Sequence, residues 1–461
     1  MGRPGVDLAY LVAAVAFILA LKGLSSPRSA RRGNLIGAAG AVLATVVVLT
    51  TEHLAHLPEI LAVMVLGGGV GVLAARRVAM TAMPQLVALF NGVGGGAAAL
   101  VAVLEFTGRG HQPLGTGAAT VFAIVVGSVS FSGSALTFAK LQELMTTRPV
   151  VLPAGRWVSV GTAVAVLVAA AWLAATGGGS PATLVLVVLA VLALIFGVLF
   201  VLPVGGADVP IVISLLNAFT GLSVAASGYL LGNVLLIVAG TLVGASGTIL
   251  TRLMAQAMGR PLTSTLFGAF QARDATAVTA GAADRPVRTG SPEDVAIMLG
   301  YARKVVLVPG YGLAVAQGQH ALRELAELLV DRGVAVEYGI HPVAGRMPGH
   351  MNVLLAEANV PYDQLKEMDQ ANSEMSSTDV ALVVGANDVV NPAARTSPGS
   401  PIYGMPILNV DQAQSIVFLK RSMRPGFAGI DNELLFDPKT TMLFGDAKDS
   451  LTKVVAAVKG L

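Results

Sequence analysis

The chain has 461 residues, of which 54% are hydrophobic and only 12% are charged. Soluble domains contain about 25% charged residues, so this composition predicts a membrane protein. The net charge of +3 is too small to indicate a nucleic-acid partner, and the lack of cysteine excludes disulfides, thiolate metal sites and iron–sulfur clusters. The six histidines show no metal-binding spacing, so no metal site is predicted.

Nine apolar stretches approach the length of about 20 residues that a membrane-spanning helix needs. They are residues 6–24, 34–51, 58–75, 83–104, 116–140, 157–176, 182–204, 209–230 and 233–256. Residues 1–256 are therefore predicted to form a polytopic transmembrane domain. Two glycine runs, Gly67–Gly71 and Gly92–Gly96, are interpreted mainly as sites of close helix packing, with an ion path as the alternative.

The positive charges of the short loops alternate between two sides, which sets the orientation in the membrane. One side has Lys22, Arg28, Arg31, Arg32, Arg76, Arg77, Lys140, Arg148, Arg156, Arg252 and Arg260. The other side has only Arg3 and Arg109. This pattern predicts an outward N-terminus and a cytoplasmic C-terminal domain, which an odd number of spans allows.

Residues 257–290 are predicted to be a linker, because much of this segment is rich in alanine, threonine and glycine. The run Ser291–Asp294 then has the composition of a helix start, with serine as the N-cap and proline in the first turn. Residues 291–461 form the second predicted domain.

A short apolar strand, Val305–Val308, is followed by a glycine-rich turn and by a helical pattern over Ala314–Arg332. Strand, G-x-G-x-x-small turn and helix are together typical of the opening of a dinucleotide-binding fold. Gly310 allows the tight turn, and Gly312 lets the backbone approach a pyrophosphate at the helix N-terminus. Val315 replaces the usual third glycine or alanine, so tight packing without a nucleotide is an equal alternative.

Strands and helices alternate after this turn, which predicts a Rossmann-like α/β domain with a parallel sheet and helices on both faces. Further strands are predicted at Val334–Tyr338, Val380–Val384, Pro406–Val410, Ser415–Leu419 and Thr441–Phe444, and helices at His350–Ala358 and Tyr362–Met368.

Ligands of such sheets bind beyond the carboxyl ends of the strands, so the segments after the strands hold the candidate site residues. After the second strand, the loop with Arg346 and Gly349 could bind a phosphate, or its arginine could be solvated. The turn Gly385, Asn387 and Asp388 follows a later strand. Its amide and carboxylate could bond a ribose or carboxamide, or could satisfy their own backbone.

A cationic segment follows the Ser415–Leu419 strand. Lys420, Arg421, Ser422 and Arg424 suit a phosphate monoester such as the 2′-phosphate of NADP, although a solvated basic loop is the alternative. Glu337, at the predicted end of the second strand, conflicts with this, because an acid there usually binds the free 2′-hydroxyl of NAD.

Few polar residues fall within the predicted spans. Asn91, Ser132, Ser134 and Asn217 lie inside spans, and Asp208 lies in a glycine turn just before one. Such groups often mark ion pathways, and they could equally make hydrogen bonds between helices.

Several long motifs resemble the beta subunit of the proton-translocating NAD(P) transhydrogenase, and the resemblance covers essentially the whole chain. The motifs are Pro309–Gln317, Gly339–Glu357, Gly385–Pro392, Lys420–Met423 and Phe444–Lys448, with Gly205–Pro210 and Ser214–Asn217 in the membrane part.

The resemblance implies that the C-terminal domain binds NADP(H), in a direction opposite to the usual one, which would remove the Glu337 conflict. It assigns Lys420, Arg421 and Ser422 to the 2′-phosphate, and Asp388 to coupling near the nicotinamide as the catalytic candidate. The full set of cofactor-binding residues that it implies is Gly310, Tyr311, Gly312, Val315, Arg346, Gly349, Gly385, Asn387, Asp388, Lys420, Arg421 and Ser422.

The resemblance also implies that hydride passes to or from NAD(H) on a partner alpha subunit while a proton crosses the membrane. The proton path would include Asn91, Ser134, Asp208 and Asn217. Some members have a histidine at the position of Asn91, so either a partner supplies the titrating group or protons pass along polar groups and water. A homodimer of alpha–beta units, surrounded by lipid in the bacterial cytoplasmic membrane, is expected.

The alternative function is a channel or transporter gated by a nucleotide-sensing cytoplasmic domain. It would need a selectivity filter of the Thr-Val-Gly-Tyr-Gly kind, which the sequence lacks. A membrane electron carrier would need haem ligands within spans or cysteine clusters, which are also missing from the sequence.

Overall fold

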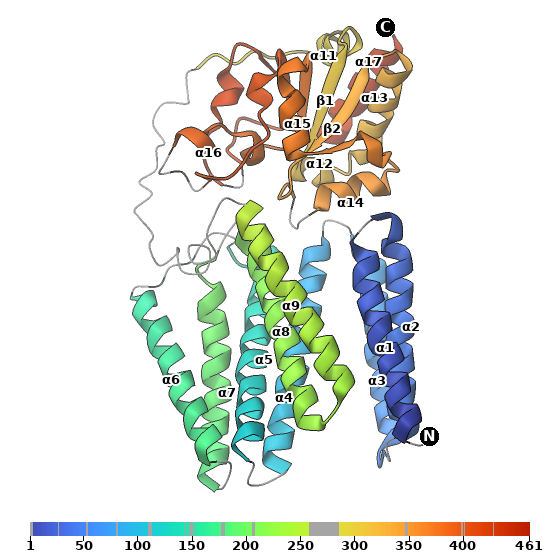
Figure 1. The fold of residues 1–461 in the computed structure, drawn as a ribbon. Helices are drawn as coiled ribbons and strands as arrows, with labels where there is room; N and C mark the ends of the chain where they lie inside the picture. The colour runs from blue at the N-terminus through green and yellow to red at the C-terminus, as the bar shows by residue number, and fades with distance from the viewer. Residues whose placement is uncertain are drawn as a thin grey trace. The chain divides into compact units, whose positions relative to one another are not determined.

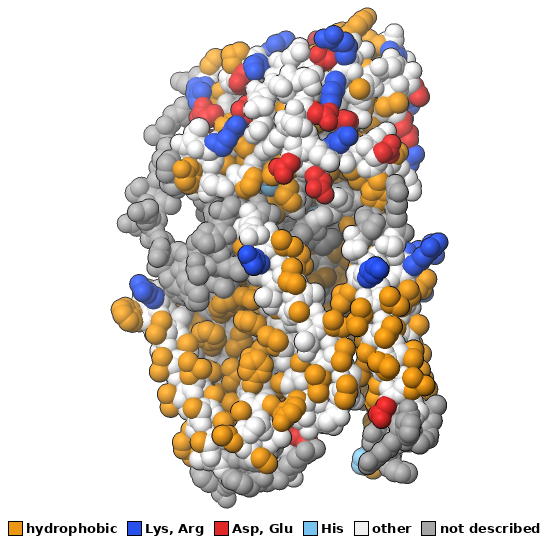
Figure 2. Space-filling view, in the orientation of Figure 1, with side chains coloured by type: hydrophobic (Ala, Val, Ile, Leu, Met, Phe, Trp, Pro, Cys, Tyr) orange, Lys and Arg blue, Asp and Glu red, His pale blue; other side chains and the backbone are white. Residues whose placement is uncertain are grey.

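The computed structural model describes residues 3–25, 27–51, 54–79, 82–108, 113–142, 144–146, 150, 152, 154–176, 180–204, 208–257, 285–345, 349–397, 400, 402–426 and 428–461. Contacts divide the chain into two compact units, Met1–Gly205 with Ile211–Thr251, and Gly206–Pro210 with Arg252–Leu461. The first, called the membrane unit below, consists of long helices, and the second is built on a sheet (Figure 1). Hydrophobic side chains cover the long helices, whereas charged side chains gather on the second unit (Figure 2).

Nine helices in the described part of the chain are long and apolar enough to cross a membrane, as predicted. They are α1 (Arg3–Leu24), α2 (Pro27–Thr51), α3 (Leu57–Arg77), α4 (Met83–Gly108), α5 (Leu114–Leu141), α6 (Gly155–Thr176), α7 (Ser180–Val201), α8 (Val209–Leu231) and α9 (Val234–Ala257). Helix α5 is the most buried of them and packs against α4, α6 and α7.

Glycine allows the closest of these helix contacts. A Cβ atom on Gly127 of α5 would lie 2.6 Å from the carbonyl oxygen of Gly95 on α4, and one on Gly221 of α8 would lie 2.5 Å from the backbone nitrogen of Gly244 on α9. The packing role predicted for Gly92–Gly96 is therefore confirmed at Gly95. In contrast, the glycines of the Gly67–Gly71 run have no other described atom within 4 Å of a Cβ position.

Lys140 lies in the last turn of α5 and is only 1% exposed. Its ammonium donates to the carbonyl oxygens of Val201 at 3.1 Å, Leu202 at 2.6 Å and Val204. These carbonyls lie in the last residue of α7 and just after it, where helical carbonyls lack intrahelical partners and the dipole favours a cation. The side chain counted as a loop charge in the sequence therefore joins α5 to the end of α7.

We expect Lys140→Met to lower the free energy of unfolding of the membrane unit by about 1.5–3 kcal/mol, the range for hydrogen bonds to a charged group. Thermal unfolding of the full chain in detergent would measure this. Lys22→Met is the matched control, because Lys22 is also in the last turn of a spanning helix but is exposed. Equal unfolding temperatures for the two variants would contradict the role of Lys140.

The second unit contains a six-stranded sheet in the order β3-β2-β1-β4-β5-β6, in which every neighbouring pair is parallel. The strands are β1 (Lys304–Pro309), β2 (Ala335–Ile340), β3 (Leu365–Glu367), β4 (Val380–Val384), β5 (Ser415–Lys420) and β6 (Thr440–Phe444). This order is that of a Rossmann-like fold, so the predicted α/β class is confirmed.

The helices of this unit cover both faces of the sheet. They are α11 (Pro292–Gly300), α12 (Tyr311–Val315), α13 (Gln319–Asp331), α14 (His350–Glu357), α15 (Met368–Glu374), α16 (Ala393–Thr396) and α17 (Ala447–Lys459). The predicted cap at Ser291 is confirmed, since its hydroxyl accepts from the Asp294 N–H at 3.1 Å and the Asp294 carboxylate accepts from the Ser291 N–H at 2.8 Å.

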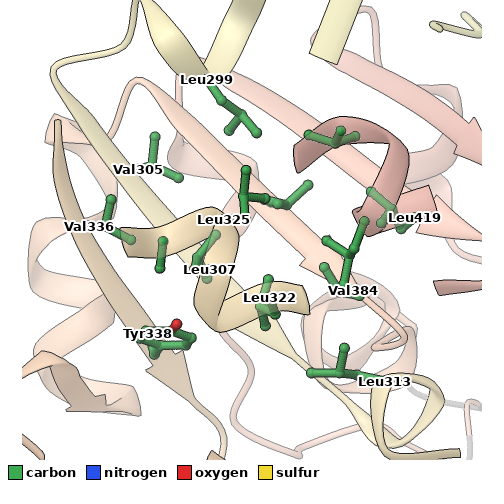
Figure 3. Packing of buried hydrophobic residues seen from close by; sticks show 14 of the residues in the cluster. Leu299, Val305, Leu307, Leu313, Leu322, Leu325, Val336, Tyr338, Val384 and Leu419 are labelled. Carbon is green, nitrogen blue, oxygen red and sulfur yellow. The ribbon is translucent and has the colours of Figure 1, made fainter. Parts of the chain in front are cut away.

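Alternate residues of each buried strand point to opposite faces, so two cores form. Leu307 of β1 packs with Leu322 and Leu325 of α13 in one core (Figure 3). Val306 and Val308 pack with residues of α15 and of the segment after it in the other. The strands are hydrophobic on both faces because helices or loops cover both.

The predicted strand at Pro406–Val410 is wrong. Leu408 and Val410 are buried on one face of the sheet, but the segment does not pair with a strand. The side chain of Asn372 instead donates to the Ile407 carbonyl at 2.9 Å and accepts from the Asn409 N–H at 2.7 Å. A side chain thus satisfies backbone groups that a ladder would otherwise pair, and the apolar pattern reflects burial under the sheet.

Two predicted helices also differ from the structure. Tyr362–Met368 is a 3-10 turn followed by the edge strand β3, which is too short for its pattern to be read. The helix predicted at Ala314–Arg332 is split into α12 and α13, because Gln317 has a φ of 50° and ends the first helix. Helices α15 and α17 were not predicted, although Asp446 caps α17 by accepting from the Lys448 N–H.

Most of the predicted linker, 257–290, lies outside the described residues. Its last residues run beside β6, where Met442 donates to the Arg288 carbonyl at 2.8 Å and accepts from the Gly290 N–H at 2.9 Å. This pairing forms a parallel bridge on the outer side of β6, just before α11.

Candidate functional site

The candidate site lies where the strand order reverses, between β1 and β4. At such a point the connections from the two strands go to opposite faces, which opens a crevice beyond their carboxyl ends. The loops after β1, β4 and β5 all reach this edge of the sheet, and they carry most of the predicted cofactor-binding residues.

The loops after β1 and β4 are in direct backbone contact. Gly310 donates its N–H to the Val384 carbonyl, and Gly312 donates to the Gly385 carbonyl, each at 2.9 Å. A Cβ atom on Gly310 would lie 2.5 Å from the Cα of Ala386, and one on Gly312 would lie 2.7 Å from the Cα of Gly385. Gly385 itself has a φ of +67°, which disfavours any side chain. The three glycines therefore allow the loops after β1 and β4 to pack tightly, which is one of the two roles that the motif predicted.

The other residues of this turn explain its departure from the usual motif. Helix α12 ends at Val315, whose side chain is 46% exposed, so no close helix–strand contact requires a smaller residue there. Tyr311 opens α12, and its ring centroid lies 6.2 Å from that of His350. Gly349 has a φ of +68° before α14. Arg346 lies outside the described residues.

The loops after β4 and β5 are joined by a chain of hydrogen bonds. Lys420 donates its ammonium to Asn387 Oδ1 at 3.0 Å, and the Asn387 amide donates to Asp388 Oδ1 at 2.9 Å. The other Asp388 oxygen accepts from the Ala428 N–H at 2.8 Å. Asn387 also accepts at its backbone carbonyl from the Asn432 amide at 3.1 Å. The structure thus brings Asn387, Asp388 and Lys420 together.

The cations at this edge differ in burial. Burial lowers the pKa of Lys420 from its ordinary value, an effect that the nearby Asp388 and Asp431 carboxylates oppose. Arg421 is exposed and makes no ion pair with any residue that the structure describes. Ser422 is half-buried, and its hydroxyl accepts from the Arg424 N–H at 3.4 Å. An anion could therefore approach Arg421 without displacing a carboxylate.

Glu337 does not lie at this edge. Strand β2 continues to Ile340, so the predicted position of Glu337 at the strand end is wrong. Its carboxylate lies 3.1 Å from Lys304 Nζ and 3.5 Å from Lys366 Nζ, both on neighbouring strands. These ion pairs hold the acid within the sheet, so it does not compete with the cations for a nucleotide.

The loop residues Gly426, Ala428 and Asn432 belong to the site but were not predicted. A Cβ atom on Gly426 would meet the side chains of Asn387 and Asp388. The only sequence signal was their position a few residues after the cationic segment, because their contacts join points of the chain about 40 residues apart.

The membrane unit contains a cluster of hydrogen-bonded polar side chains from α4, α5 and α8. Asn91 of α4 donates its amide to Ser134 Oγ at 2.9 Å and Ser130 Oγ at 3.3 Å, both on α5. Ser130 Oγ lies 2.6 Å from Thr220 Oγ1 of α8. Asn91 and Ser134, two of the predicted path residues, are therefore in contact, and Ser130 and Thr220 were missed. The i, i+4 spacing of Ser130 and Ser134 was the available signal, because it puts both on one helix face.

Ser132 and Asn217, the other polar residues noted within the spans, lie outside this hydrogen-bonded group. Ser132 donates to Ser128 of its own helix at 3.1 Å. Asn217 is half-buried, and its side chain makes no hydrogen bond to the described residues. Asp208 lies just before α8, nine residues from Asn217 along the chain. The described residues include no group of three His, Cys, Asp or Glu side chains that could hold a metal ion.

The family model of the NAD(P) transhydrogenase beta subunit matches residues 6–457, which include both units and every candidate residue. The chain belongs to this family. The NAD(P) transhydrogenase subunit beta of Rhodospirillum rubrum is 47% identical over 459 residues, with 98% of each chain covered. A protein of the same name from a defined strain of that bacterium matches to the same extent. The enzyme class expected from the sequence motifs, an NAD(P) transhydrogenase, is thus confirmed.

One histidine of the transhydrogenase motif Gly339–Glu357 is held in a fixed neutral form. His341 is 2% exposed; its Nδ1 accepts from the Val343 N–H at 3.2 Å, so Nε2 carries the proton and donates to the Pro406 carbonyl at 2.7 Å. Burial lowers the pKa of His341 from 6.5 to about 4. This histidine joins the loop after β2 to the segment under the sheet.

We expect acid to destabilise the second unit through His341. The unfolded chain takes up a proton near pH 6.5 and the folded chain only near pH 4, so stability is complete above pH 6.5 and falls as the pH drops toward 4. The full loss is about 3 kcal/mol. Pulse proteolysis of the full chain in detergent between pH 7 and pH 4.5 would measure it. His341→Gln should flatten the dependence, whereas the exposed control His320→Gln should leave it unchanged.

Proposed function

We propose that this chain binds NADP(H) at the carboxyl edge of its sheet and exchanges hydride with NAD(H) held by a partner alpha subunit, coupled to proton movement. The observation that carries the proposal is the position of Lys420, Arg421 and Ser422 beside the Asn387–Asp388 turn, at the point where the strand order reverses. Three groups with donor hydrogens suit the oxygens of a phosphate monoester.

The residues present fit a dinucleotide phosphate. Among the described residues, Lys420 is held only by a neutral amide oxygen, at 3.0 Å, so a phosphate could replace this partner without breaking an ion pair. Arg421 is exposed and has a rigid fork of donors. The Gly310–Gly312 turn, Gly349 and Arg346 would lie toward the pyrophosphate, with Tyr311 and Val315 on the same helix. Bound NADP(H) supplies a hydride donor or acceptor, so no protein nucleophile or metal is required.

Asp388 has a linking role in this proposal. Its carboxylate accepts from Asn387 and from the backbone of Ala428, and it therefore ties the loop beside Gly385 to the loop that carries the cations. A change near the nicotinamide would alter both loops together through this carboxylate. This is why we assign Asp388 to coupling.

The proposal includes a proton path and an assembly. Asn91, Ser134, Asp208 and Asn217 would line the path, and the Asn91–Ser134 hydrogen bond supports its centre. Because the chain has one dinucleotide fold, a partner must hold NAD(H). The distribution of lysine and arginine supports an outward N-terminus and a cytoplasmic nucleotide domain. A homodimer of alpha–beta units in the bacterial cytoplasmic membrane completes the proposed assembly, with the unit boundaries near residues 256 and 291.

Arg421→Ala should weaken NADP(H) binding by about 1.5–3 kcal/mol and leave NAD(H) binding nearly unchanged, because only NADP(H) has the 2′-phosphate. Titration calorimetry on the full chain would measure both. Arg424→Ala is the matched control, since it removes a second exposed arginine of the same loop and should have a smaller effect. A similar loss for both nucleotides would show that Arg421 supports the fold instead.

The proposed function is tested by reconstitution into sealed vesicles. The chain alone should transfer no hydride between NADPH and an NAD⁺ analogue, and addition of the alpha subunit should start both hydride transfer and proton movement. Absorbance of the reduced analogue and a pH-sensitive dye would follow the two together. Turnover by the chain alone, or hydride transfer that never moves a proton, would refute the proposal.

A further inference from the structure

Three helices of the membrane unit meet at the hydroxyl of Ser130. This oxygen lies 3.3 Å from the Asn91 amide nitrogen on α4, 2.6 Å from Thr220 Oγ1 on α8 and 2.9 Å from the Leu216 carbonyl oxygen on α8. Thr220 Oγ1 is also 3.3 Å from the backbone carbonyl of Asn91.

Ser130 and Thr220 have fewer hydroxyl hydrogens than the contacts that could each take one. Ser130 and Thr220 have one hydrogen each. Three contacts could take them: Ser130 to Leu216, Ser130 to Thr220, and Thr220 to Asn91. Two oxygens 2.6 Å apart repel each other unless a hydrogen lies between them, so the Ser130–Thr220 contact is always filled.

Two settings satisfy this requirement. In the first, Ser130 donates to the Leu216 carbonyl and Thr220 donates to Ser130. In the second, Ser130 donates to Thr220 and Thr220 donates to the Asn91 carbonyl. Both carbonyls lie inside α-helices and already accept an intrahelical bond, so the one left over in each setting is not orphaned. The settings are therefore close in energy and interchange by rotation of two hydroxyls.

The settings differ in what they do to Asn91. In the first, Ser130 Oγ accepts from both Thr220 and the Asn91 amide. In the second, it accepts from the Asn91 amide alone, while Thr220 holds the Asn91 backbone. Asn91 is only 8% exposed, and its Oδ1 has no hydrogen-bond partner among the described residues. A buried acceptor in this state indicates a donor that the described chain does not supply, such as water or a protonated group of another subunit.

We propose that the Ser130–Thr220 pair is a two-setting hydrogen-bond switch that positions the Asn91 carboxamide, keeping its amide on α5 and its oxygen turned to the proton-bearing donor. The proposal rests on the proposed proton-coupled function, because only that function brings a proton to Asn91. Ser130 and Thr220 are positioning residues: they hold the carboxamide and do not themselves carry the proton.

The decisive comparison is between Thr220→Val and Thr220→Ser. The methyl group of Thr220 lies 3.4 Å from a Cβ position on Gly94, so it contributes to packing against α4. Thr220→Val keeps this methyl and the shape but removes the hydroxyl, whereas Thr220→Ser keeps the hydroxyl and removes the methyl. A switch predicts that the Val variant is defective and the Ser variant is close to normal. A packing role predicts the opposite order.

The experiment uses the full chain with its alpha partner in sealed vesicles, and it measures protons moved per hydride transferred. Thr220→Val and Ser130→Ala should lower this ratio about three- to tenfold, the effect of losing one neutral hydrogen bond. Thr220→Ser should stay near the normal ratio. Ser132→Ala is the control on α5, because Ser132 bonds only within its own helix. Thermal unfolding of each variant in detergent confirms that its membrane unit is folded.

A second measurement does not depend on proton movement. The infrared band of the Asn91 carboxamide, identified by its loss in Asn91→Ala, should shift in Thr220→Val and Ser130→Ala but not in Thr220→Ser or Ser132→Ala. If the unmodified chain moves no protons, the proposed function fails and this band alone decides the switch. An unshifted band in the Val variant, or normal coupling in it together with defective coupling in the Ser variant, would overturn the switch.

Discussion

The contact between the two backbones that leave β1 and β4 determines the arrangement of the carboxyl edge of the sheet. Gly310 and Gly312 donate to the carbonyls of Val384 and Gly385, and a side chain on any of the three glycines would break this approach or require a disfavoured φ. The contact fixes Asn387 next to the turn. Lys420, one strand further along, then reaches Asn387. The position of Lys420 relative to the Gly310–Gly312 turn therefore depends on the backbone contact between the loops after β1 and β4.

Close approach has the same importance in the membrane unit, with a different chemical consequence. Glycines at Gly95, Gly127 and Gly221 bring helices close enough for backbone contact. Hydroxyls at these crossings then bond to carbonyls and amides of other helices, as Ser130 and Thr220 do. Lipid offers no hydrogen-bond partner, so polar groups within the spans must be satisfied by each other or by trapped water. Such groups can exchange partners without exposure to solvent.

Two lysines differ in bonding, and this difference separates a structural cation from one that we propose to bind a phosphate. Lys140 donates to three carbonyls, which uses all three ammonium hydrogens. It has no capacity left for an anion. Lys420 makes one hydrogen bond to the described residues, to a neutral amide oxygen, and so keeps hydrogens for the proposed phosphate. Burial differs in the same sense, since Lys140 is 1% exposed and Lys420 is half-buried.

The sequence by itself determined the features that depend on local pattern. Apolar length predicted nine spans, alternation predicted a parallel α/β domain, and the composition at Ser291 predicted a capped helix; each is present in the structure. Motifs also predicted which loops carry Asn387 and Lys420. These features could be predicted because each arises from residues close together in the chain.

Only the tertiary structure decided how distant residues meet. Ser130 and Thr220 are 90 residues apart, and no local pattern pairs them. The segment Pro406–Val410 has the apolar composition of a strand, but Asn372 takes its backbone hydrogen bonds, so it lies under the sheet and not within it. Glu337 was predicted to end its strand as a ribose-binding acid, but it lies within β2 and pairs with Lys304 and Lys366. In each case a partner far away in the sequence decides the role of the residue, because burial and hydrogen bonding depend on which groups the fold brings within reach.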